Sequence, residues 1–173
     1  GPQKGGTPDL LKEMDRLAVS IAKDLSRSTS SDIATTPGAG AAGGLGGAIL
    51  ALGGKIQPGF ATISQLIGLE EQIAQADLII TGEGSLDGQT EKGKVPFGVA
   101  KLAKKHGKPV FALCGKRSVE IGTMASLVSG AYAIQLGPVS LSEAMNRENT
   151  LQNIGITGSE LVNLFLEGVS YHD

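Results

Sequence analysis

Three short apolar runs that alternate with helical patterns constrain the fold of this chain more than any other feature. Their nearly continuous apolar character is typical of strands buried on both faces. Helical patterns follow the first two runs, and a Ser140–Glu143 capping box opens another helix after the third. This order predicts an α/β fold with a parallel βαβαβα sheet and ligands at the carboxyl ends of the strands. The three runs are Asp77–Gly82, Pro109–Cys114 and Ala131–Leu136.

The segment before these runs is expected to be mostly helical. Thr7 is placed to cap a helix that runs to about Leu25, with Pro8 at its first position. A polar stretch from Ser26 to Asp32 then predicts a loop. The following segment, 37–52, begins too rich in glycine to form a helix by propensity alone and becomes helix-like in its second half.

Composition removes several function classes. Charges nearly balance, with 15 basic and 17 acidic residues, which disfavours a nucleic-acid-binding surface. No apolar run reaches the ~18 residues that a membrane helix needs, and no signal-peptide pattern opens the sequence. The single cysteine, Cys114, suits a reducing compartment and is expected to be a small buried side chain. We therefore expect a cytoplasmic protein with a small-molecule partner and no membrane or nucleic acid.

Glycine is the unusual residue, at 26 of 173 against an average near ~7%. The spacing of Gly38, Gly40 and Gly43 matches the dinucleotide-binding fingerprint, but the residues before it are too few to predict a strand, and no acidic residue occurs between Gly43 and Glu70. Three interpretations stay open. The glycines belong to a dinucleotide site, they supply N–H groups that bind an anion at a helix start, or they allow close helix packing.

The polar stretch from Thr81 to Lys94 carries the residue types of a phosphate-handling site. It follows the first predicted strand and contains Glu83 and Asp87, which can hold Mg²⁺ or accept a proton. Lys94, near a helix start, can neutralise phosphate. Within this stretch, Gly88, Gly93 and Lys94 have the Gly-x-x-x-x-Gly-Lys spacing of a P-loop, but Val95 stands where that motif needs a hydroxyl. The alternative interpretation is a solvated polar loop.

Three stretches together resemble the bacterial class I glycerate kinase family. They are Gly1–Thr7, Pro37–Gly46 and Ile80–Thr90, the last continued by Gly93-Lys94. The resemblance covers only the C-terminal half of the family's chain. It implies that residues 1–75 are the tail of an inserted, glycine-rich α/β domain, and that residues 76–173 are the C-terminal half of a Rossmann-like domain.

The same resemblance implies ATP-dependent phosphorylation of D-glycerate, at the 2-hydroxyl, with Mg²⁺. Phosphoryl transfer depends mainly on positioning and charge neutralisation. The implied catalytic residues are Glu83, Asp87 and Lys94, with Glu83 and Asp87 also as metal ligands. The implied substrate-binding or phosphate-binding residues are Gly38, Gly40, Gly43, Gly82, Gly84 and Thr90.

Other functions remain open beside the kinase. A chain that matches half of a family could be a non-catalytic binding module, a truncated half-domain that needs a complementing chain. On either interpretation we expect association, as a homo-oligomer or with the N-terminal half, and little turnover by the 173-residue chain alone. A nucleotide-dependent oxidoreductase is a weaker third interpretation, because the acidic residue expected after Gly43 is missing.

Overall fold

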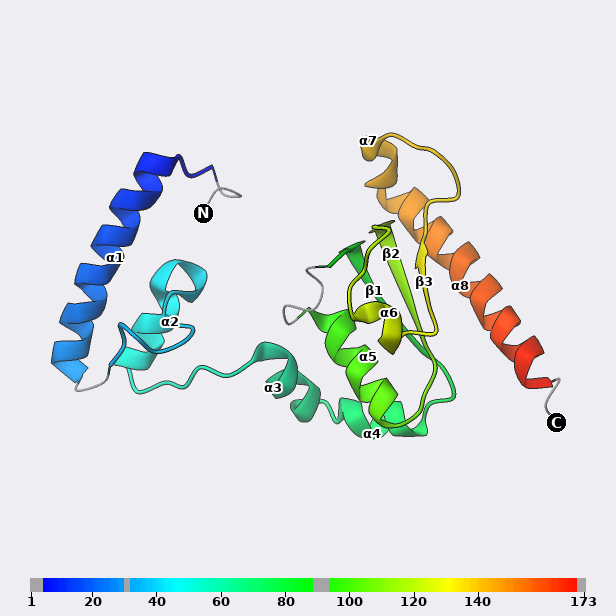
Figure 1. Cartoon of the computed structure of the whole chain (residues 1–173), viewed down its shortest axis with the longest axis horizontal. Helices are drawn as coiled ribbons and strands as arrows, with labels where there is room; N and C mark the ends of the chain where they lie inside the picture. Colours follow the sequence, from blue (N-terminus) through cyan, green and yellow to red (C-terminus); the bar gives the residue numbers. More distant parts are fainter. Residues whose placement is uncertain (1–4, 30–31, 89–93, 171–173) are drawn as a thin grey trace. The chain divides into compact units, whose positions relative to one another are not determined.

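The computed structural model describes residues 5–29, 32–88 and 94–170, and the chain divides into two compact units between Gln57 and Pro58 (Figure 1). The first unit contains α1 (Pro8–Thr29) and α2 (Ala41–Ala51). The elements of the second unit are α3 (Gly59–Leu66), α4 (Leu69–Gln75), β1 (Ile79–Leu86), α5 (Val95–Lys105), β2 (Val110–Arg117), α6 (Met124–Leu127), β3 (Gly130–Ala133), α7 (Leu141–Ala144) and α8 (Arg147–Ser170). The predicted boundary between residues 75 and 76 refers to the two domains of a longer family member, and it stays a prediction.

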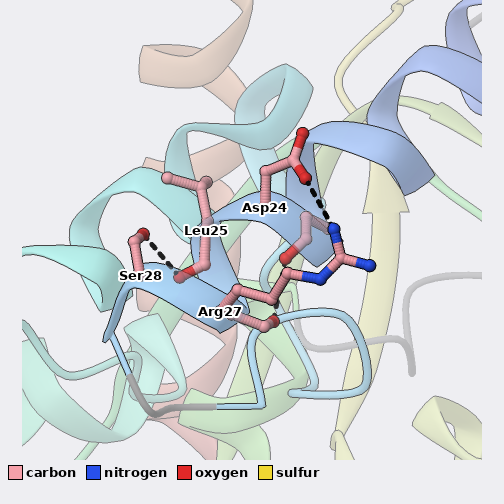
Figure 2. A network of polar contacts seen from close by, with 6 residues as sticks. Asp24, Leu25, Arg27 and Ser28 are labelled. Carbon is pink, nitrogen blue, oxygen red and sulfur yellow. Dashed lines mark hydrogen bonds and ion pairs between the residues drawn. The ribbon is translucent and has the colours of Figure 1, made fainter.

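Helix α1 begins as expected and ends later. The Leu10 N–H group donates to Thr7 Oγ1 at 3.4 Å, so Thr7 caps the helix. The loop expected from Ser26 is helical as far as Thr29. Figure 2 shows two contacts that support this last turn, a 3.3 Å ion pair between Arg27 and Asp24 and a 3.0 Å hydrogen bond from Ser28 Oγ to the Leu25 carbonyl. Hydroxyl groups that bond back to the preceding turn allowed a polar sequence to stay helical.

Close backbone approach explains part of the glycine-rich segment. The first half of α2 is not regular helix, since Ala42, Gly43 and Gly44 all have positive φ. A Cβ atom at Gly46 would lie 2.3 Å from the Gly38 carbonyl oxygen. Gly46 is buried, and no side chain fits there unless the backbone moves. Close packing of the backbone therefore requires glycine at position 46.

The second unit confirms the predicted α/β fold. Its described strands form a parallel sheet in the order β1-β2-β3. Strands β1 and β2 extend further than the apolar runs, because pairing continues through Ser85 opposite Lys116 and Leu86 opposite Arg117. Glu83 therefore lies within a strand and not in the expected loop. The capping box at Ser140 is present, but it opens the short helix α7, and α8 begins separately at Arg147.

Each face of the sheet has its own core. On one face, α5 and α6 cover apolar residues that include Ala112 and Cys114. On the other face, α8 places Leu161 against Phe111 and Leu113. In Figure 1 these helices lie on opposite sides of the strands. Burial on both faces explains why the strands read as continuous apolar runs.

Polar contacts of Glu70 link helix α4 to the C-terminal end of α5 at the protein surface. Glu70 Oε1 accepts a hydrogen bond from Lys105 Nζ, and His106 Nε2 lies 2.9 Å from the same oxygen. These hydrogen bonds, from Lys105 first and His106 second, lower the pKa of Glu70 below its ordinary value of 4.5. A lowered carboxyl pKa in the folded state stabilises the fold above the unfolded value and loses that effect as pH falls.

Glu70→Gln is therefore expected to flatten the acid side of the stability profile. The wild-type chain should lose stability as pH falls below 4.5 and Glu70 becomes protonated, and the variant should lose less over the same range. Urea unfolding at several pH values measures this. Glu71→Gln is the control, since Glu71 is an exposed neighbour in the same helix. Equal pH dependence in all three proteins would contradict the assignment.

Candidate functional site

Three of the predicted site residues meet at the carboxyl end of β1. Lys94 Nζ lies 3.0 Å from Glu83 Oε2 and 4.0 Å from Asp87 Oδ1. The same ammonium group donates a 3.4 Å hydrogen bond to the Ser85 carbonyl. We call Glu83, Asp87 and Lys94 the charged cluster. The structure thus brings together residues that are as many as eleven positions apart in the sequence.

Local structure fixes the cluster from two elements. Glu83 is held within β1, opposite Cys114 of β2, and its side chain is only 12% exposed. Lys94 is the N-cap residue of α5 and has an extended backbone. Asp87 follows the last residue of β1 and its side chain is 37% exposed. A strand end and a helix start therefore present these charges at the edge where parallel sheets bind ligands.

The carboxylates of the cluster fit a magnesium ion that is shared with phosphate. Mg²⁺ is usually held by one or two carboxylates, with substrate phosphates and water completing the octahedron. Glu83 and Asp87 provide two such groups, and Lys94 Nζ now lies within 4.0 Å of both. Among the described residues no group of three or more His, Cys, Asp or Glu could hold a metal ion.

A cavity of about 550 Å³ adjoins the cluster. Its walls are the middle of β1 and β2, the start of the segment after β3, and the corner between α7 and α8. Glu83 links the two features across the sheet. It lines the cavity on the α8 side, whereas its side chain, opposite Cys114 in the register, pairs with Lys94 on the α5 side. The size is that of an ordinary small-molecule site.

Two predicted glycines, Gly82 and Gly84, line this cavity and differ in what the fold requires of them. A Cβ atom at Gly82 would lie 2.8 Å from the Leu113 carbonyl oxygen, so strand packing excludes a side chain there. Around the corresponding position at Gly84 no described atom lies within 4 Å. The fold therefore explains the glycine at 82 and leaves the glycine at 84 without a packing reason.

The other predicted glycines lie in the first unit. Gly38 has a φ of +90° and would place a Cβ atom 2.8 Å from Ile56 Cγ2. Gly40 and Gly43 line a separate cavity of about 510 Å³, together with apolar residues of α1 such as Leu17. Their phosphate-binding role stays a prediction. Thr90 lies outside the described residues.

Sequence reasoning missed two cations at the same edge of the sheet. Lys116 and Arg117 lie in the extension of β2, opposite Ser85 and Leu86 of β1. Their position directly after a buried run that ends at Cys114 is the signal that could have found them. Cys114 itself is buried, as expected, and its Sγ donates to the Tyr132 carbonyl at 3.4 Å. Burial raises the pKa of the Cys114 thiol, which suits a structural side chain.

In the ranges that the structure describes, no helix is both long enough and apolar enough to cross a bilayer.

Comparison with known proteins gives one consistent result. The model of the glycerate kinase family matches residues 1–166. A glycerate kinase of Halalkalibacterium halodurans is 39% identical over 168 residues, which cover 92% of this chain and 44% of that protein. A glycerate 2-kinase of Escherichia coli K12 is 40% identical over 125 residues, which cover 72% of this chain and 33% of that protein.

A solved structure agrees with these sequence matches. The crystal structure described as glycerate kinase 2 from Salmonella typhimurium LT2 superposes with a TM-score of 0.70 and 31% sequence identity. The match covers 97% of this chain and 42% of that one. The chain thus spans less than half the length of the relatives it matches.

Proposed function

The chain belongs to the glycerate kinase family, and from that premise we propose that the whole protein transfers the γ-phosphoryl group of ATP to D-glycerate. The product in this proposal is 2-phosphoglycerate. One observation supports it above the rest: two carboxylates and a lysine converge at the carboxyl end of a parallel strand, beside a cavity. That arrangement supplies the charges that phosphoryl transfer needs.

In the proposed reaction the 2-hydroxyl oxygen of glycerate attacks the γ-phosphorus. The bond between that phosphorus and the oxygen bridging it to the β-phosphate breaks, and ADP leaves. The hydroxyl proton passes to a carboxylate, for which Asp87 and Glu83 are the candidates. Lys94 turns from Glu83 toward the phosphate oxygens and offsets the charge that develops on them. Mg²⁺, held by Glu83 and Asp87 when bound, would neutralise the donor phosphates.

The test is a coupled ADP-release assay on the whole protein with D-glycerate, ATP and Mg²⁺. We expect one ADP for each phosphoglycerate formed, and phosphorus NMR of the product distinguishes the 2-phosphate from the 3-phosphate. L-glycerate is the matched control for the substrate. A folded whole protein that releases no ADP above the no-acceptor control would remove the proposal.

A second candidate, a half-domain that binds a complementing chain, is favoured by the surface of α1. Among the described residues, none in α1 is buried, and Leu10, Met14 and Ile21 are each at least 51% exposed. Exposed apolar surface of this kind marks an interaction site. Sedimentation of the 173-residue chain at tens of micromolar tests it: a partner or self-association is expected, and a strictly monomeric mass counts against it.

A further inference from the structure

We propose that the cavity beside the charged cluster binds the nucleoside part of the phosphate donor, with the phosphates extending over Gly84 toward Lys94. The inference rests on the proposed function and adds to it the place of each half of the nucleotide. The acceptor, glycerate, is assigned no part of this cavity.

The chemistry of the walls favours a flat heterocycle over a small anion. Apolar residues of β1, β2 and α8 and of the segments after β3 and α7 line the space, including Ile80, Leu113, Ile134, Met145 and Ile154. No described residue that lines the cavity is Lys or Arg. A purine ring buries its apolar faces between such side chains, whereas the carboxylate of glycerate would lose its hydration without a cation in return. The volume of about 550 Å³ also exceeds what a three-carbon acid fills.

Gly84 supplies an independent observation. Glycine inside a strand weakens the strand and commonly marks a place where another molecule approaches the backbone. Gly84 does not have the positive φ that would require glycine, and no described atom lies within 4 Å of the position of its missing Cβ. It lines the cavity and lies in β1 between Glu83, which pairs with Lys94, and Ser85, whose carbonyl accepts a hydrogen bond from Lys94. The missing side chain therefore leaves the backbone open to a ligand beside the residues that Lys94 contacts.

Hydrogen bonds hold the part of the cavity wall that α7 and α8 form, opposite the strands. Asn146 Oδ1 accepts hydrogen bonds from the N–H groups of Glu148 and Asn149, at 2.9 and 3.1 Å. Thr150, which lines the cavity, donates from Oγ1 to the Asn146 carbonyl at 2.8 Å. The Ser140 capping box fixes the start of α7. These bonds hold the corner between α7 and α8, so a ligand would meet a largely preformed site.

The experiment fills the cavity in the whole protein. Ala144, on α7, lines it, and Ala144→Phe should weaken binding of Mg·ADP at least about tenfold by titration calorimetry without glycerate. The KM for ATP should rise by a similar factor, while the KM for D-glycerate stays within about twofold. Ala125→Phe is the matched control, because Ala125 is exposed on α6 and does not line the cavity.

A second variant covers the case in which Ala144→Phe fails to fold. Gly84→Ala meets no described atom within 4 Å, so it should keep the wild-type melting temperature and still weaken Mg·ADP at least about fivefold. Gly168→Ala, near the end of α8, is its control.

Each outcome decides the inference separately from the proposed function. Weaker Mg·ADP binding in both variants, with wild-type binding in both controls, supports the nucleoside site even if D-glycerate is not the acceptor. Wild-type Mg·ADP affinity in the folded variants overturns it, even if the protein phosphorylates glycerate. A lowered melting temperature in Ala144→Phe with unchanged affinity also overturns it, and assigns the cavity to packing with another segment.

Discussion

Asp87→Asn in the whole protein is expected to lower kcat/KM for D-glycerate by roughly 10² to 10⁴. The side chain lies directly after β1, 4.0 Å from Lys94 Nζ, in a position to hold a metal or orient a hydroxyl. The substitution keeps the shape and removes the charge. Because the side chain is 37% exposed, the free energy of unfolding should change by no more than about 0.5 kcal/mol. Steady-state kinetics and urea unfolding of the same preparation measure both effects.

Asp77→Asn is the matched control for this variant. Asp77 is exposed and precedes β1, so the same chemical change is made at the opposite end of the strand. Its kcat/KM should stay within about threefold of the wild type. If Asp87→Asn behaves the same way at saturating Mg²⁺, Asp87 is a solvated loop residue. The reacting groups would then be Glu83 or residues outside this sequence.

The 173-residue chain by itself is expected to turn over at less than about a thousandth of the ~10 s⁻¹ that is typical of enzymes. The chain spans 44% of one relative's length and 33% of another's. Phosphoryl transfer requires both substrates to be enclosed and water to be excluded, because water competes as the acceptor. A partial cleft cannot meet that requirement.

The measurement is the ADP-release assay on the purified chain beside the whole protein at equal concentration. Circular dichroism shows whether the chain is folded, so that loss of structure is not read as loss of activity. A folded chain with a kcat near that of the whole protein would show that its own residues suffice. The proposed dependence on a complementing segment would then be wrong.

The sheet was predictable because burial on both faces leaves a plain signature. The run Val110–Cys114 is buried along its whole length, and such runs separated by helices allow few arrangements. The meeting of Glu83, Asp87 and Lys94 was predictable for the same reason, since the end of one strand and the start of the next helix share an edge. Their chemical roles stay predictions.

The extent of the elements was not predictable from local pattern. Glu83 and Ser85 are polar, yet they lie in β1 because main-chain pairing with β2 continues past the apolar residues. The helix predicted after the second apolar run is reduced to α6, since Gly122 has a φ of +58° that a helix cannot include. The cavity could not be predicted from the sequence either, because its far wall comes from α7 and α8, more than fifty residues after β1.

The sequential order of the strands has a consequence for synthesis on the ribosome. β1, β2 and β3 are neighbours in space in the order in which they are made, so the sheet can be assembled as the chain emerges. One face is covered early, because α5 lies between β1 and β2 in the sequence. The face that carries Phe111 and Leu113 waits for Leu161 of α8. Until α8 leaves the exit tunnel, the nascent chain keeps this apolar face of the sheet exposed.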